Sequence, residues 1–218
     1  MPQRTAIIAG ATGLVGSLCL KQLLDDRAYA QVIAVSRRAV AESHPKLVQK
    51  VVEFDKLRQL APLVADDAFC ALGTTIAKAG SQQAFRKIDL DYSKAFAEFA
   101  LAGGARQLAL VSSVGANARS WNFYLRTKGE LEEAVKALAF TSLHIFRPSF
   151  LMGLRPEQRA GEGIGLALSK VFQFAFVGGL SKYRPMAAST VAAAMIAAVK
   201  RAAPGYHTYF FKEMQAMA

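Results

Sequence analysis

The chain has 218 residues, of which 53% are hydrophobic and 20% are charged. This composition excludes disordered and fibrous proteins, and the length favours one folded domain spanning residues 1–218. The formal net charge of +11 points to anionic ligands, but nucleic acid is disfavoured as a partner because Lys and Arg are spread along the chain without an aromatic-interleaved basic stretch.

In chain order, short apolar runs alternate with segments of helical periodicity. Strands are expected at residues 5–9, 32–36, 47–54, 68–72, 107–112, 142–146 and 206–211, and helices at 14–26, 56–65, 81–102, 122–139 and 187–202. The strands are apolar along their length, which is typical of parallel strands covered by helices on both faces. The sequence therefore predicts an α/β fold with a doubly wound parallel sheet, a Rossmann fold.

A glycine-rich turn, residues 10–16, joins the first expected strand to the first helix. Its glycines allow a tight turn and a close approach of the backbone to a pyrophosphate, and the helix N-terminus offers free N–H groups to phosphates. The turn therefore predicts a dinucleotide site. The residues expected to bind the cofactor here are Gly10, Thr12, Gly13, Leu14, Val15 and Gly16.

The end of the second expected strand distinguishes between two cofactors. An acidic residue there would accept hydrogen bonds from the adenosine ribose of NAD(H). The sequence instead has Ser36, Arg37 and Arg38, and two guanidinium groups can hold a 2′-phosphate with charge-assisted bonds. NADP(H) is therefore favoured over NAD(H), with arginines that merely solvate a loop as the alternative.

A candidate catalytic group follows further along the chain. Tyr124 and Lys128 are spaced to leave one face of the expected helix, where an ammonium group would stabilise a phenolate and make Tyr124 a general acid or base. Ser112 and Ser113 end the preceding strand, at the sheet edge where parallel strands bind ligands. A serine hydroxyl there could hold a substrate oxygen.

Together these motifs resemble the short-chain dehydrogenase/reductase superfamily, in its atypical NADP-binding branch of Tat-interacting-protein-like oxidoreductases and their bacterial relatives. The resembling segments are residues 10–16, 36–38, 54–55, 70–75, 89–92, 112–116, 124–130 and 146–148.

The resemblance implies roles for individual residues of these segments. Asp55 would contact the adenine edge, and the backbone of Leu72, Gly73 and Thr74 would follow the adenosine and its ribose. Lys128 would also bond the nicotinamide ribose, and Pro148 would border the nicotinamide ring. The resemblance further implies that Ser113 orients the substrate oxygen, with Ser112, beside the cofactor, as the alternate.

Two functions stay open. One is an NADP(H)-dependent oxidoreductase, a reductase of a small carbonyl compound that forms the alcohol, with Ser113, Tyr124 and Lys128 as catalytic residues. The other is a regulatory or redox-sensing protein that binds NADPH without turnover and presents residues 164–180 to a protein partner. A nucleotide-sugar substrate is disfavoured because the segment after residue 151 is short for one.

Residues 1–150 are expected to form the dinucleotide-binding core, and 151–218 a C-terminal elaboration that completes the substrate pocket. Residues 164–180 are interpreted as a buried or partner-facing helix rather than a membrane span, with a weak peripheral membrane contact and a homodimer left open. The N-terminus has no signal-peptide pattern, and Cys19 and Cys70 lie in apolar runs, so a cytoplasmic location is expected.

Other titratable residues do not suggest a site. His44, His144 and His207 are widely separated, so no metal site is expected. The adjacent carboxylates at 25–26, 66–67 and 132–133 are expected to be solvated.

Overall fold

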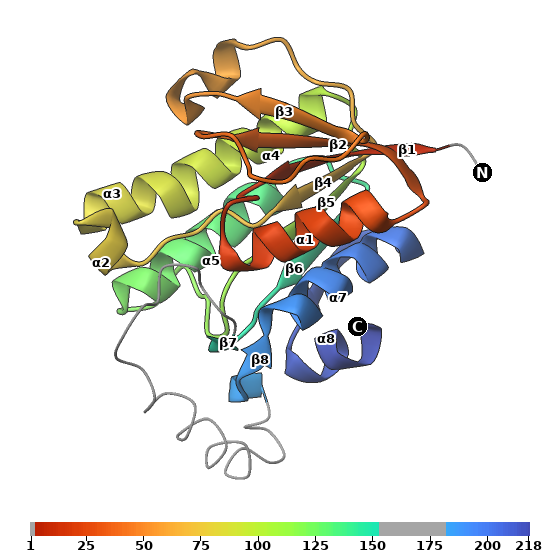
Figure 1. Ribbon diagram of the computed structural model, residues 1–218. Coiled ribbons are helices and arrows are strands. Elements are labelled where there is room, and N and C mark those ends of the chain that lie inside the picture. Colours follow the sequence, from red (N-terminus) through yellow and green to blue (C-terminus); the bar gives the residue numbers. More distant parts are fainter. Residues whose placement is uncertain (1–2, 153–181) are drawn as a thin grey trace, which may run out of the picture.

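Seven parallel strands form the centre of the molecule (Figure 1), in the order β3-β2-β1-β4-β5-β6-β9. The structure is a computed structural model and describes residues 3–152 and 182–218. The strands are β1 (Arg4–Ala9), β2 (Tyr29–Ser36), β3 (Leu47–Val51), β4 (Asp67–Cys70), β5 (Gln107–Val111), β6 (Ser142–Phe146) and β9 (Gly205–Tyr209). The reversal of strand order at β1 is that of a doubly wound sheet, so the predicted Rossmann fold is confirmed.

Helices cover both faces of this sheet. They are α1 (Leu14–Asp25), α2 (Ile76–Ala79), α3 (Gln82–Arg86), α4 (Ser93–Ala102), α5 (Phe123–Lys136), α7 (Ala188–Arg201) and α8 (Phe211–Met217). Figure 1 shows α1 and α7 side by side on one face and α4 and α5 on the other. Because successive strand residues point to opposite faces, Ile8 packs in the cluster of α1 and α7, and Ile7 in the cluster of α4 and α5.

Two expected helices differ from the observed ones. The helix expected at 56–65 is a 3₁₀ helix, η1 (Phe54–Gln59), and an extended chain follows it because Pro62 disfavours helical conformation in the preceding residue. The helix expected at 81–102 is α3 and α4 joined by a π-helical turn, η2 (Lys87–Tyr92).

Short elements at the C-terminal side were not expected. A two-stranded parallel sheet pairs β7 (Leu151–Met152) with β8 (Met186–Ala187), and α8 ends the chain after β9. The segment expected to be helical at 164–180 lies outside the described residues. Within the described residues, no helix is long and apolar enough to cross a membrane. The division at residue 150 stays a prediction.

Two carboxylates expected to be solvated are instead buried. The side chain of Asp67 is fully buried, and that of Glu132 is 5% exposed. Asp67 is paired with Arg4, and Glu132 with Arg147, and such partners make burial of a charge tolerable. Sequence adjacency to a second acid therefore gave the wrong environment for both residues.

The cysteines are free and buried as expected, and burial raises the pKa of the Cys70 thiol to about 11. Two of the three histidines are closer together than their sequence spacing suggests. His144 and His207 face each other across β6 and β9 with ring centroids 5.4 Å apart. Burial, together with His207, lowers the pKa of His144 to about 4. Among the described residues, no three His, Cys, Asp or Glu side chains gather as a metal site would require.

Candidate functional site

The glycine turn packs too tightly for side chains. Gly10 has φ +86°, and a Cβ there would lie 2.4 Å from the carbonyl carbon of Ala71. A Cβ on Gly16 would lie 2.0 Å from the carbonyl oxygen of Gly10. These contacts seat the start of α1 against the ends of β1 and β4, as the tight turn requires.

The N-terminus of α1 is suited to a phosphate. Its N-cap, Gly13, provides no side-chain hydrogen bond, and the first helical turn carries no acidic residue. The first N–H groups of a helix have no partners within the helix, and the helix dipole favours an anion beside them. The turn can therefore accept a pyrophosphate without displacing a protein group.

A cavity of about 150 Å³ lies beside the turn, at the end of β2. Its lining includes Gly10, Thr12, Gly13, Ser36, Arg37, Arg38, Leu72, Gly73 and Thr74, all expected from the sequence to bind the cofactor, together with Phe54 and Ile88, which were not. The hydroxyl of Ser36 donates to the carbonyl oxygen of Arg38 at 2.7 Å, which fixes the loop carrying the two arginines. Among the described lining residues there is no carboxylate.

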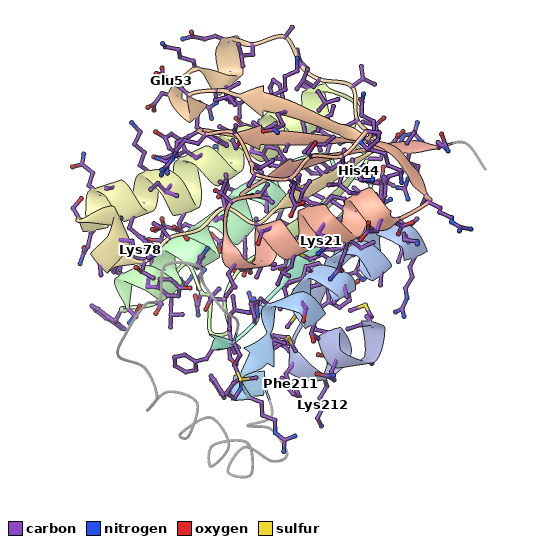
Figure 2. All side chains as sticks on the ribbon, viewed as in Figure 1. Lys21, His44, Glu53, Lys78, Phe211 and Lys212 are labelled. Atoms are coloured by element: carbon purple, nitrogen blue, oxygen red, sulfur yellow. The ribbon has the colours of Figure 1, made fainter. Side chains whose placement is uncertain are left out.

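A larger cavity, of about 630 Å³, adjoins the first, and residues 71–74 line both. It lies at the carboxyl ends of the strands, and Lys78, which lines it, is labelled at this edge in Figure 2, opposite His44 at the amino ends. The predicted residues that line it are Val15, Leu72, Gly73, Thr74, Ser112, Ser113, Tyr124 and Lys128. The two cavities, together called the cleft below, bring the turn and the candidate catalytic group to the same edge of the sheet.

Tyr124 and Lys128 both line this larger cavity from α5. Asn122 begins the helix, since its side-chain oxygen accepts a hydrogen bond from the Leu125 amide at 3.1 Å. The ring of Tyr124 packs on Phe85 with centroids 5.5 Å apart, which limits its rotation.

Lys128 is paired with a residue that sequence reasoning missed. Its ammonium nitrogen lies 2.6 Å from Oδ1 of Asp89 in η2, and the two side chains are 5% and 0% exposed. Burial disfavours the charged lysine, but attraction to Asp89 and to the oxygen of Tyr124 outweighs this and raises the pKa of Lys128. Asp89 also lines the cavity.

The two serines at the end of β5 are held by different acceptors. Ser112 donates to Oε1 of Glu132, which Arg147 also holds. Ser113 donates to the carbonyl oxygen of Val114 at 3.3 Å, a longer bond. The hydroxyl of Ser113 is therefore the easier of the two to redirect toward a ligand.

Four predicted cofactor residues do not line either cavity: Leu14, Gly16, Asp55 and Pro148. Asp55 is exposed and accepts hydrogen bonds from Lys87 at 3.1 Å and Tyr92 at 2.9 Å, both from η2. The carbonyl oxygen of Pro148 accepts from the Val114 amide at 2.9 Å, and Ser149, Phe150 and Leu151 line the cavity in its place. The signal that could have found Asp89 is its place in residues 89–92, one of the segments that carry the family resemblance.

A parallel sheet with a glycine turn at its switch point and one cleft across its carboxyl ends defines the class of Rossmann dinucleotide-binding proteins. Comparison with known proteins agrees. The sequence profile of the NAD(P)H-binding family matches residues 10–159, and the chain belongs to this family.

Two relatives show more closely which members of this family the chain resembles. Protein HTATIP2 of Rattus norvegicus is 40% identical over 167 residues, which are 74% of this chain and 69% of that protein. Protein FMP52 of Candida glabrata, named as mitochondrial, is 37% identical over 166 residues, 75% of this chain and 70% of that one. The chain is thus an atypical short-chain dehydrogenase/reductase that resembles HTATIP2.

Solved structures agree on the fold. The human epimerase family protein SDR39U1, solved with NADPH, superposes with a TM-score of 0.65 at 17% identity, over 94% of this chain and 74% of that one. At this identity the likeness concerns the fold alone.

The expected cytoplasmic location is wrong by this comparison, because FMP52 proteins of several fungi are named mitochondrial. The expectation rested on the cysteines and on the absence of a secretory signal segment. Mitochondrial targeting uses amphipathic, Arg-rich sequences rather than an apolar segment, so that absence did not separate the two compartments.

Proposed function

We propose that this protein is an NADP(H)-dependent oxidoreductase that interconverts a small carbonyl compound and its alcohol. The observation that carries this proposal is the pair of adjoining cavities, with Arg37, Arg38 and the glycine turn at one and Tyr124 and Lys128 at the other. Both cavities lie at the carboxyl ends of the strands, where a dinucleotide binds in a doubly wound sheet.

The preference for NADP(H) is supported by the charge of the smaller cavity. Arg37 and Arg38 border it, and the described residues around it include no acid to accept from ribose hydroxyls. A 2′-phosphate in this cavity would receive charge-assisted hydrogen bonds from either guanidinium group. Gly10, Thr12 and Gly13 would hold the pyrophosphate, and Leu72, Gly73 and Thr74 the adenosine side.

The chemistry is supported by the residues around the larger cavity. When bound, the cofactor would supply a hydride to the carbonyl carbon of the substrate. Tyr124 would donate its phenolic proton to the carbonyl oxygen as that oxygen gains charge, and Lys128 would stabilise the phenolate left behind. Ser113 would donate a hydrogen bond to the same oxygen, because Ser112 is engaged by Glu132.

The test is a fluorescence titration with NADPH and NADH, followed by turnover of a panel of small aldehydes and ketones by the wild type and Tyr124→Phe. Loss of the proton donor is expected to reduce kcat by about 10²–10⁴-fold, while the NADPH affinity changes by less than about twofold, because the ring remains. Tyr206→Phe is the matched control, since Tyr206 is outside both cavities and 39% exposed. Equal turnover by the wild type and Tyr124→Phe would refute the role of Tyr124.

A second candidate is a regulatory protein that binds NADPH without turnover. It is favoured by the serines, since both hydroxyls already donate to protein acceptors. Tight NADPH binding with no turnover of any carbonyl by the wild type would support this candidate over the reductase.

A further inference from the structure

The buried ion pair between Asp89 and Lys128 joins η2 to α5, and both residues line the larger cavity. Burying two charges costs several kcal/mol per ion, and apolar replacements of such pairs are often as stable. Stability alone therefore does not explain a charged pair at this position.

The two oxygens of the Asp89 carboxylate contact different parts of the cleft. Oδ1 lies 2.6 Å from the ammonium nitrogen of Lys128, and Oδ2 accepts a hydrogen bond from the Thr74 amide at 2.9 Å. Thr74 lines both cavities, so one carboxylate joins the shared wall of the cleft to the lysine of the larger cavity. A Cβ on Gly73 would lie 3.5 Å from Oδ1 and 3.7 Å from Nζ, so this glycine leaves the pair without a covering side chain on that side.

The backbone that carries Asp89 is unusual. It belongs to the π-helical turn η2, and single π turns inside α-helices are frequent at functional sites. Two other residues of the same turn, Lys87 and Tyr92, hold Asp55, which follows the adenosine-side residue Phe54. One turn thus supports both halves of the cleft.

We propose that Asp89 is a positioning residue for the cofactor, whose carboxylate holds the Lys128 ammonium toward the nicotinamide half of the cleft and the Thr74 amide in the shared wall. This inference rests on the proposed function, and it adds that the η2 turn sets the adenosine and nicotinamide halves relative to each other.

The charges around Lys128 lead to a measurable consequence. The titratable groups that act on it are Asp89 from η2, Tyr124 from its own helix and Cys70 from β4. Of these groups, Asp89 raises the pKa of Lys128 the most, against the lowering effect of burial. Without its carboxylate, burial is expected to lower the pKa of Lys128.

The experiment compares the wild type with Asp89→Asn between pH 7.5 and 9.5, where a 2′-phosphate stays fully ionised. In protein carrying ¹³C-labelled lysine, the Lys128 Cε resonance, assigned with Lys128→Met, is followed through the titration. NADPH affinity is followed by fluorescence at each pH, and adenosine 2′,5′-bisphosphate, which lacks the nicotinamide half, serves as the control ligand.

In the wild type we expect the Lys128 resonance to stay that of an ammonium group and the NADPH affinity to be flat. In Asp89→Asn we expect deprotonation within the range and a loss of NADPH affinity of about tenfold per pH unit above that point. The bisphosphate should bind both proteins equally, because an asparagine side chain keeps an oxygen that can accept from the Thr74 amide. If NADH binds more tightly than NADPH, NADH replaces NADPH as the ligand and AMP replaces the bisphosphate as the control.

A flat NADPH profile in Asp89→Asn, or an equal loss for the bisphosphate, would overturn the proposal. If Asp89→Asn does not fold, the wild-type spectrum decides, because a Lys128 that deprotonates below pH 9 is not held by Asp89. A wild type that binds neither NADPH nor NADH contradicts the proposed function instead, and the lysine spectra then report on Asp89 separately.

Discussion

The sheet buries one aspartate at each end, and their surroundings differ. At the amino end, Asp67 at the start of β4 is bonded to three side chains, those of Arg4, Tyr29 and Gln107. At the carboxyl end, Asp89 is bonded to the Thr74 amide and paired with Lys128 beside a cavity of about 630 Å³. Both side chains are fully buried.

The difference separates two uses of a buried charge. The partners of Asp67 come from β1, β2 and β5, and neither cavity of the cleft reaches them. The partners of Asp89 are themselves cavity-lining groups. A closed network of this kind affects stability, whereas a charge beside a cavity affects what binds there, and each expectation can be tested separately.

The largest expected effect is on stability, from Asp67→Ala. The substitution leaves the Arg4 guanidinium, the Tyr29 hydroxyl and the Gln107 amide without their acceptor, and breaking a buried pair in this way costs about 3–5 kcal/mol. Urea denaturation at pH 7 measures this loss. Cofactor affinity of the folded fraction should be unchanged, and a loss of affinity would contradict the separation of the two ends.

The next effect is a pH dependence at the same residue. Burial raises the pKa of Asp67 to about 6, although Arg4, Tyr29 and Gln107 oppose this. The folded state then holds the proton of Asp67 more tightly than the unfolded state. The stabilisation that this protonation provides is fully present below about pH 4 and is lost as pH rises through 6. Two pH units correspond to about 3 kcal/mol.

Asp67→Asn cannot ionise and serves as the reference for this prediction. The free energy of unfolding of the wild type, relative to that of Asp67→Asn, is expected to fall between pH 4 and pH 6.5 in urea denaturation. A constant difference between the two proteins across this range would show that Asp67 stays ionised when buried.

The same contrast explains what could be predicted from sequence. The strands of the sheet are continuous apolar runs, and the glycine turn and the Tyr124–Lys128 spacing are local patterns, so fold and cleft could be predicted. Short elements such as β7, β8 and α8 depend on contacts from elsewhere in the chain, and local sequence carries little signal for them.

The buried acids were missed for a related reason. From the sequence, Asp67 and Glu132 were expected to be solvated and Asp89 was given no role, because the partners of all three lie in other elements. Only the fold brings Arg4 to Asp67, Lys128 to Asp89 and Arg147 to Glu132. The π turn that carries Asp89 was likewise hidden within one long expected helix.

The smallest expected effect concerns the choice between NADPH and NADH at the carboxyl end of the sheet. Arg37 and Arg38 are both exposed, so the double substitution to Ala should leave the free energy of unfolding within about 0.5 kcal/mol. A charge-assisted hydrogen bond is worth about 1.5–3 kcal/mol, so NADPH affinity is expected to fall by about 10–100-fold while NADH affinity stays the same.

Arg27→Ala is the control, because Arg27 is also exposed but lies in the turn before β2, at the other end of that strand. Equal losses for NADPH and NADH would mean that the arginines attract any dinucleotide by charge, and the preference for a 2′-phosphate would then have to come from elsewhere in the cleft.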